Sequence, residues 1–149
     1  MKYNKAAFMK MLPKYHKRSV PKVYKRLSGK ISNLMSSLKV RALEAGVEFD
    51  VTSEEVRKLL YDSYGTKCKY CGVKIIRLDK ANPISCDHIV PLQKGGASVV
   101  SNLQFICSSC NRRKSSLTEA DFLHILKWIG EQNEEIKKHM LFQMAKGGF

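Results

Sequence analysis

The sequence predicts a small α+β protein in which helices flank a short core braced by a metal ion. Apolar residues recur at helical spacing over residues 31–45 and again over residues 122–129. Between these two stretches lie two C-x-x-C pairs, a pattern typical of a zinc site. A chain of 149 residues can bury one modest core with extensions, and we therefore expect one compact unit.

The N-terminal part of the chain is strongly basic. The protein carries 27 Lys and Arg residues against 13 Asp and Glu, and no acidic residue precedes Glu44. A segment of one charge sign repels itself, and it is stabilised when it neutralises a polyanion and releases counterions. Nucleic acid is the polyanion that we expect. A basic surface that only serves solubility, or that contacts a membrane surface, is the alternative.

Residues 1–30 are predicted to form a basic arm that becomes ordered on its partner. Pro13 and Pro21 interrupt this stretch, so it can hold at most short helical pieces. The candidate contacts of this arm with nucleic acid are Lys17, Arg18, Lys25 and Arg26.

A helical extension is predicted over residues 31–65. Its first helix is amphipathic and covers residues 31–45. Apolar and acidic residues then alternate over residues 47–51, which favours a short strand. Thr52 followed by Glu55 is typical of a capping box, and it predicts the start of a second helix.

The C-terminal segment, residues 118–149, is also predicted to be helical. Thr118 is a candidate N-cap, and the apolar stripe over residues 122–129 predicts a helix with one buried face. Trp128 is expected to belong to that buried face. Residues 131–145 alternate acid and base, as exposed helices often do.

The four paired cysteines are predicted to bind a structural zinc ion. Two close pairs of thiolates can complete a tetrahedron around Zn²⁺, and a site closed by four cysteines leaves no position for a water molecule. A redox motif does not need a second copy, so the alternative of two unrelated thiol pairs is weaker. The ligands are Cys68, Cys71, Cys107 and Cys110.

The cysteine count and the hydropathy of the chain also bear on its location. An odd number of cysteines, five in all, fits metal ligation in a reducing compartment better than a disulfide framework. No run of apolar residues approaches the roughly 18 residues of a spanning helix. We therefore expect a soluble, intracellular protein of the cytoplasm with no membrane partner.

The segment between and after the cysteine pairs holds polar residues and glycines that are specific in combination. They are Asp87-His88-Ile89-Val90-Pro91, Gly95-Gly96, Asn102-Leu103 and Asn111-Arg112-Arg113-Lys114. Together with the four cysteines, they closely resemble the HNH nuclease family over residues 66–117. The resemblance implies a ββα-metal core that carries the Asp-His pair on the first strand of a hairpin. It also implies hydrolysis of DNA with a divalent cation.

Phosphodiester hydrolysis suggests a role for each polar residue. A neutral imidazole can take a proton from water near neutral pH, which makes His88 the candidate general base. Asp87 is a hard oxygen ligand for a divalent cation. The resemblance implies that Asn102 orients the base, and that Asn111 supplies a second ligand oxygen, as in an HNN variant. Such a donor set favours Mg²⁺ or Mn²⁺. The candidate phosphate contacts are Arg112, Arg113 and Lys114.

Several alternatives remain open on the sequence alone. Asp87 and His88 can merely close a hairpin in a non-catalytic zinc-knuckle protein that binds DNA. The same chemistry also serves an RNA-directed nuclease. Asn102 and Asn111 can be turn or cap residues. One site per chain predicts nicking by a monomer, and a weak homodimer that cuts both strands remains the other possibility.

Overall fold

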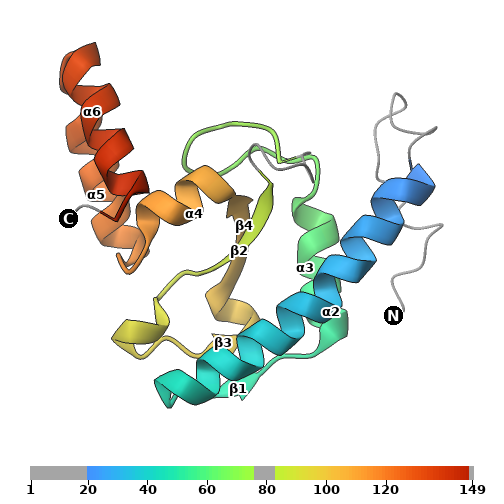
Figure 1. Ribbon diagram of the computed structural model, residues 1–149. Helices are drawn as coiled ribbons and strands as arrows, with labels where there is room; N and C mark the ends of the chain where they lie inside the picture. The colour runs from blue at the N-terminus through green and yellow to red at the C-terminus, as the bar shows by residue number, and fades with distance from the viewer. Residues whose placement is uncertain (1–19, 76–82, 148–149) are drawn as a thin grey trace.

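The computed structural model describes residues 20–75 and 83–147, and it confirms the predicted α+β class (Figure 1). A central antiparallel hairpin is followed directly by a short helix, and longer helices lie on two sides of this unit. The helices are α2 (Val20–Ala45), α3 (Ser53–Ser63), α4 (Ser108–Lys114), α5 (Glu119–Gly130) and α6 (Glu134–Ala145). The strands are β1 (Phe49–Asp50), β2 (Ile84–His88), β3 (Ser98–Val99) and β4 (Leu103–Cys107).

Helix α2 is longer than the sequence predicted. It begins at Val20 and not at Ile31, so the part of the predicted arm from residue 20 onward is helix. Pro21 does not prevent this, because a proline in the first turn of a helix has no backbone partner to lose. Lys25 and Arg26 are therefore exposed helix residues, whereas Lys17 and Arg18 lie outside the described residues. In the described part of the chain, no helix is both long and apolar enough to cross a membrane.

The main hydrophobic core joins α2 and α3 to the hairpin. One face of α2 is buried against α3, and both helices contribute to the same cluster as the strands β2 and β4. Thr52 and Glu55 form the predicted capping box at the start of α3, with reciprocal hydrogen bonds between side chain and backbone. The largest fully buried side chains of this cluster include Leu27, Ile31, Leu38, Leu60, Tyr61, Ile84 and Ile106.

The hairpin and the helix that follows it form a ββα unit. Strand β2 pairs antiparallel with β4, and the register places Asp87 opposite Gln104 and His88 opposite Leu103. Helix α4 starts at the residue after Cys107, without an intervening loop. The strand predicted over residues 47–51 is shorter, Phe49–Asp50, and it pairs in parallel with β3.

A second, smaller cluster holds the C-terminal helices against α4. Phe122, Ile129 and Met144 are its buried residues, and the Phe122 ring meets the Tyr70 ring edge to face at 4.9 Å between centroids. The prediction that Trp128 is buried was wrong, since 46% of this residue is exposed. Trp128 is one position before the buried Ile129, and one residue turns a helix by roughly 100°. The apolar stripe is therefore narrower than the sequence suggested.

If α2 shares one core with the hairpin, truncating its buried face should destabilise the whole protein. We expect Leu38→Ala, at a side chain that is 1% exposed, to lower the free energy of unfolding by about 2–5 kcal/mol. Leu43→Ala in the same helix is the matched control, since Leu43 is 82% exposed and should change stability by less than about 0.5 kcal/mol. Urea unfolding followed by circular dichroism measures both. Equal effects of the two substitutions would contradict the packing of α2 described here.

Candidate active site and zinc knuckle

The four paired cysteines converge on one point. Their Sγ atoms all lie within 4.8 Å of one another, and the Sγ atoms of Cys71 and Cys107 are 3.6 Å apart. Zinc–thiolate bonds of roughly 2.3 Å place the sulfurs of a tetrahedral site about 3.8 Å apart, so this cluster fits a Zn²⁺ ion. We call these four residues the zinc knuckle. Their arrangement is consistent with the structural zinc site predicted from the sequence.

Local geometry sets up each half of the knuckle. The first pair sits on a tight turn in which the Gly72 N–H donates to the Cys68 carbonyl oxygen at 2.9 Å. Gly72 has a φ of +71°, a backbone conformation that residues with a side chain rarely adopt. Cys107 ends β4 and caps α4, where the Cys110 N–H donates to its sulfur at 3.5 Å. A hydrogen bond from Cys110 lowers the pKa of Cys68, which favours a thiolate in this cluster.

Three predicted catalytic residues line one pocket of about 220 Å³. Asp87 and His88 reach it from the end of β2, and Asn111 reaches it from α4. Arg41 of α2 also lines it. Cys86 lies in the wall of this pocket, and burial raises the pKa of its thiol to about 12, so it is a neutral thiol. The fold therefore brings together residues that are up to 24 positions apart in the candidate motif, from Asp87 to Asn111, and adds an arginine from a distant helix.

His88 is held as a neutral imidazole. Its residue is 5% exposed, and its Nε2 atom lies 2.9 Å from the Oγ atom of the buried Ser98. Burial lowers the pKa of His88 to about 4, and the positive charges of Arg41 and Lys114 act in the same direction. An imidazole that is neutral at physiological pH can accept a proton. Because Ser98 occupies Nε2, Nδ1 is the other ring nitrogen available for that step.

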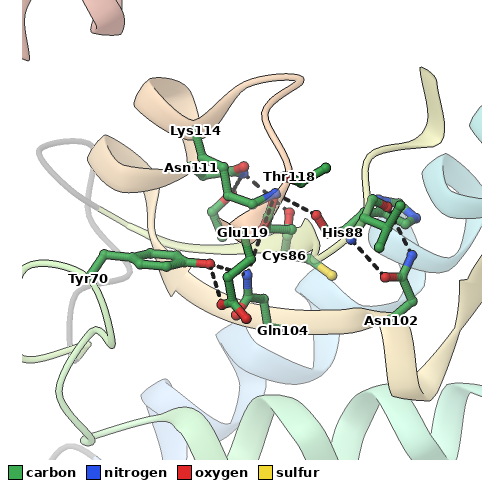
Figure 2. Close-up of polar contacts among 12 residues, drawn as sticks. Tyr70, Cys86, His88, Asn102, Gln104, Asn111, Lys114, Thr118 and Glu119 are labelled. Atoms are coloured by element: carbon green, nitrogen blue, oxygen red, sulfur yellow. Dashed lines mark hydrogen bonds and ion pairs between the residues drawn. The ribbon is translucent and has the colours of Figure 1, made fainter. Parts of the chain in front are cut away.

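Asn102 closes the loop that follows His88. Its Oδ1 atom accepts from the Val90 N–H at 2.8 Å, and its Nδ2 atom donates to the carbonyl oxygens of Val90 at 3.0 Å and Ala97 at 2.9 Å. Gly96 packs closely against the Val90 carbonyl group and the Asn102 side chain. A Cβ atom at Gly96 would be 1.9 Å from the Val90 carbonyl oxygen. Figure 2 shows the Asn102 side chain beside this loop and away from Asn111. Its contacts are those of a residue that fixes the loop.

The carboxylate of Asp87 is buried in an ion pair with Lys114. The Lys114 Nζ atom lies 3.2 Å from Oδ1 and 3.1 Å from Oδ2 of Asp87, and it donates to the His88 carbonyl oxygen at 2.6 Å. Burial raises the pKa of Asp87, whereas hydrogen bonding from Gln104 and the charge of Lys114 oppose that rise. The prediction of Lys114 as a phosphate contact was wrong, because its side chain is 0% exposed. Lys114 lies one helical turn after the buried Cys110, on the inner face of α4.

Gln104 links Asp87 to the zinc knuckle. Its Nε2 atom donates to Asp87 Oδ2 at 2.7 Å and to the Tyr70 hydroxyl oxygen at 2.8 Å. The Tyr70 hydroxyl in turn donates to Glu119 Oε1 at 2.8 Å, and Glu119 also pairs with Lys69. Figure 2 shows Tyr70, Gln104 and Glu119 meeting at this point. Tyr70 lies between the first two cysteines, so the knuckle and the Asp87 carboxylate share one hydrogen-bond network.

Asn111 is oriented by two contacts to β2. Its Nδ2 atom donates to Ser85 Oγ at 2.6 Å and to the Cys86 carbonyl oxygen at 3.2 Å. These bonds use the amide nitrogen, and Oδ1 is the remaining ligand atom of the side chain. Of the two following arginines, Arg112 is exposed, while the Nε atom of the half-buried Arg113 donates to the Leu141 carbonyl oxygen at 3.4 Å. Arg113 therefore contacts α6, and Arg112 is the one that faces solvent.

A comparison with protein-family models identifies the segment of the chain that carries the knuckle and the pocket residues of the hairpin and α4. The family model described as HNH endonuclease matches residues 68–117. Residues 68–117 are an HNH endonuclease domain. The matched range contains the zinc knuckle and the whole ββα unit, as the sequence predicted, whereas α2, α3, α5 and α6 lie outside it. No curated protein and no solved structure matched the chain.

Sequence reasoning missed four residues that complete the site of the HNH domain. Gln104 could have been noticed as a polar residue within an otherwise apolar strand, and Tyr70 as an aromatic inside a knuckle. Ser98 carries no such signal, because a serine between a Gly-Gly pair and an asparagine is typical of any loop. Arg41 precedes the HNH domain by many residues, and only the packing of α2 brings it to the pocket.

Loss of one knuckle cysteine should release the metal. We expect the purified protein to hold about one equivalent of zinc, and Cys71→Ser to lose it together with the folded state of the HNH domain, since a structural zinc contributes folding free energy. Cys86→Ser is the matched control, because Cys86 is not part of the cluster. Metal content by atomic emission and thermal unfolding measure both properties. Full zinc content in Cys71→Ser would contradict the assignment of the ligands.

A methyl group at Gly96 should disrupt the loop that Asn102 closes. The new Cβ atom would clash with backbone, which a side-chain rotation cannot relieve, so we expect Gly96→Ala to cost several kcal/mol, more than about 3 kcal/mol. Gly130→Ala is the control, since a Cβ atom there meets nothing within 4 Å. Thermal unfolding of the two variants gives the comparison. Similar midpoints of thermal unfolding for the two variants would show that the backbone near Val90 can shift to accept the methyl group without a large loss of stability.

Proposed function

We propose that the protein is a metal-dependent endonuclease that hydrolyses DNA phosphodiester bonds at the pocket of the HNH domain. The observation that carries this proposal is the convergence of Asp87, His88 and Asn111 on one pocket. The pocket combines a neutral base with two side chains that offer oxygen ligands. It lies in a chain with a formal net charge of +14, which favours a polyanionic substrate.

Asp87 and Asn111 are the residues that would hold a divalent cation. Their donors are a carboxylate and an amide oxygen, the hard ligands that suit Mg²⁺ or Mn²⁺. The carboxylate is held in position by Gln104 and Lys114, and the amide by Ser85 and Cys86. When bound, such a cation polarises the phosphate and stabilises charge on the leaving oxygen.

His88 would act as the general base. The Ser98 hydroxyl holds Nε2, so Nδ1 would take the proton from the attacking water molecule. The Lys114 ammonium donates to the His88 carbonyl oxygen, and this contact fixes the backbone that carries the imidazole. Asn102 would act as a positioning residue, because it fixes the loop after His88 and touches neither ring nitrogen. With one such pocket in the described chain, a single-strand nick is the expected product.

Removal of the base should abolish cleavage and leave the fold intact. We expect His88→Ala to lower the rate of nicking of supercoiled plasmid in Mg²⁺ or Mn²⁺ by a factor of about 10²–10⁴. His124→Ala on α5 is the matched control, because His124 is exposed and lines none of the pockets near the HNH site. Zinc content should be unchanged in both variants, which would show that the HNH domain is still folded. The midpoint of thermal unfolding should fall in His88→Ala alone, because that substitution removes a buried side chain that contacts Ser98.

The same assay separates the proposal from its rivals. A zinc-loaded wild type that binds plasmid tightly but never nicks it in either metal would favour a non-catalytic DNA-binding protein. Cleavage of structured RNA with no effect on duplex or single-stranded DNA would favour an RNA-directed nuclease. Equal nicking by wild type and His88→Ala would exclude His88 as the base.

A further inference from the structure

Helix α2 supplies a basic wall to the pocket of the HNH domain. Arg41 lines the pocket together with His88 and Asn111. Its charge contributes to the lowered pKa of His88, which places it within electrostatic reach of the imidazole. Arg41 precedes the range that matches the HNH family, so this contact is a property of the extension and not of the matched domain.

A second pocket continues the first one along α2. It has a volume of about 400 Å³ and shares Arg41, Cys86 and Asn111 with the pocket of the HNH domain. Its other lining residues include Lys30 and Asn33. Because the two pockets share three lining residues, they lie side by side between α2 and the ββα unit, and we call them together the groove.

The periodicity of α2 explains how Lys30 and Arg41 reach the same groove. They are eleven residues apart, and at roughly 100° per residue their directions around the helix differ by only about 20°. At 1.5 Å per residue they are about 16 Å apart along the helix axis. This length equals the rise of roughly five base pairs along the axis of duplex DNA, at 3.4 Å per base pair.

The charges along this groove are suited to a polyanion. Neither Lys30 nor Arg41 has an ion-pair partner among the residues that the structure describes. Asp87 is the one acidic residue among those that line the two pockets, and Lys114 already balances its charge. An arginine at the pocket also offers a planar fork of donors that matches phosphate oxygens.

We propose that this groove is a phosphate-binding track for the DNA strand that is cut. Arg41 binds the scissile phosphate or its immediate neighbour, and Lys30 with Asn33 binds the phosphates that follow along α2. The track rests on the proposed function for the identity of its ligand. It adds one statement to that function: the DNA strand leaves the pocket in a direction parallel to α2.

The test compares two pairs of substitutions that remove the same charge. Arg41→Gln/Lys30→Gln removes both cations of the track, and glutamine keeps part of the aliphatic stem, so the helix should remain folded. Lys39→Gln/Lys127→Gln is the matched control. Lys39 is exposed and projects about 200° around α2 from Arg41, and Lys127 is exposed on α5. Neither control residue lines the groove.

Binding is measured without cleavage, so that the track can fail or succeed independently of the nuclease assignment. Both pairs are placed in the His88→Ala background, and the affinity for a short DNA duplex is followed by fluorescence anisotropy at several salt concentrations. Each phosphate contact contributes roughly 0.9 to the slope of log affinity against log salt. We expect the track pair to reduce the slope by about two and the control pair to reduce it far less.

Two outcomes would overturn the proposal. One is an unchanged slope in the Arg41→Gln/Lys30→Gln variant, which would mean that these cations do not contact phosphates. The other is an equal loss in both pairs, which would mean that the basic surface attracts DNA diffusely. Neither outcome depends on whether the wild type cuts DNA, since that question is answered by the plasmid assay.

Discussion

The positions of the candidate site residues depend on the zinc knuckle. Its four thiol groups come from two C-x-x-C pairs that are far apart in the sequence and meet at one point. Cys107 is at once the last residue of β4, one of the four knuckle cysteines and the N-cap of α4. A metal at the knuckle therefore fixes the angle at which α4 leaves the strand. That angle decides where Asn111 and Lys114 lie relative to β2.

The buried ion pair between Lys114 and Asp87 is best understood as an orienting device. Taking two charges out of water costs more than many such pairs return in stability, so the pair is weak evidence for a gain in folding free energy. Its geometry is nevertheless well defined, because the ammonium contacts both carboxylate oxygens and a backbone carbonyl at the same time. Together with the hydrogen bond from Gln104, these contacts fix the orientation of the Asp87 carboxylate at the pocket. Preorganisation of this kind is what a metal ligand needs.

The sequence predicted the parts of the site that depend on local spacing. The two C-x-x-C pairs predicted the knuckle, and Thr52 with Glu55 predicted the cap of α3, because both are encoded within a few residues. The family pattern pointed to Asp87, His88 and Asn111, which do line a common pocket. The burial of Lys114 was not predictable, since a lysine in a basic run is typical of a surface and only tertiary packing provides its buried partner.

Longer-range features were missed for a different physical reason. The early start of α2 depends on a proline being tolerated in a first turn, and the position of Arg41 depends on how that helix packs. The exposed edge of Trp128 depends on which face of α5 meets α6. None of these is encoded by periodicity alone, because periodicity gives the faces of a helix but not the partner that each face meets.

Helix α2 has two roles that cannot be separated. Leu38 and Ala42 are buried on one side of this helix, and Arg41 lies between them in sequence and faces the pocket. Without α2, the apolar face of α3 that packs on it would be exposed to water, the core cluster that both helices share with β2 and β4 would be incomplete, and the pocket would lose one of its walls. The matched range of residues 68–117 thus shares its hydrophobic core with α2 and α3, which lie outside that range. Helix α2 therefore supplies both buried residues of the shared core and Arg41, which lines the candidate pocket.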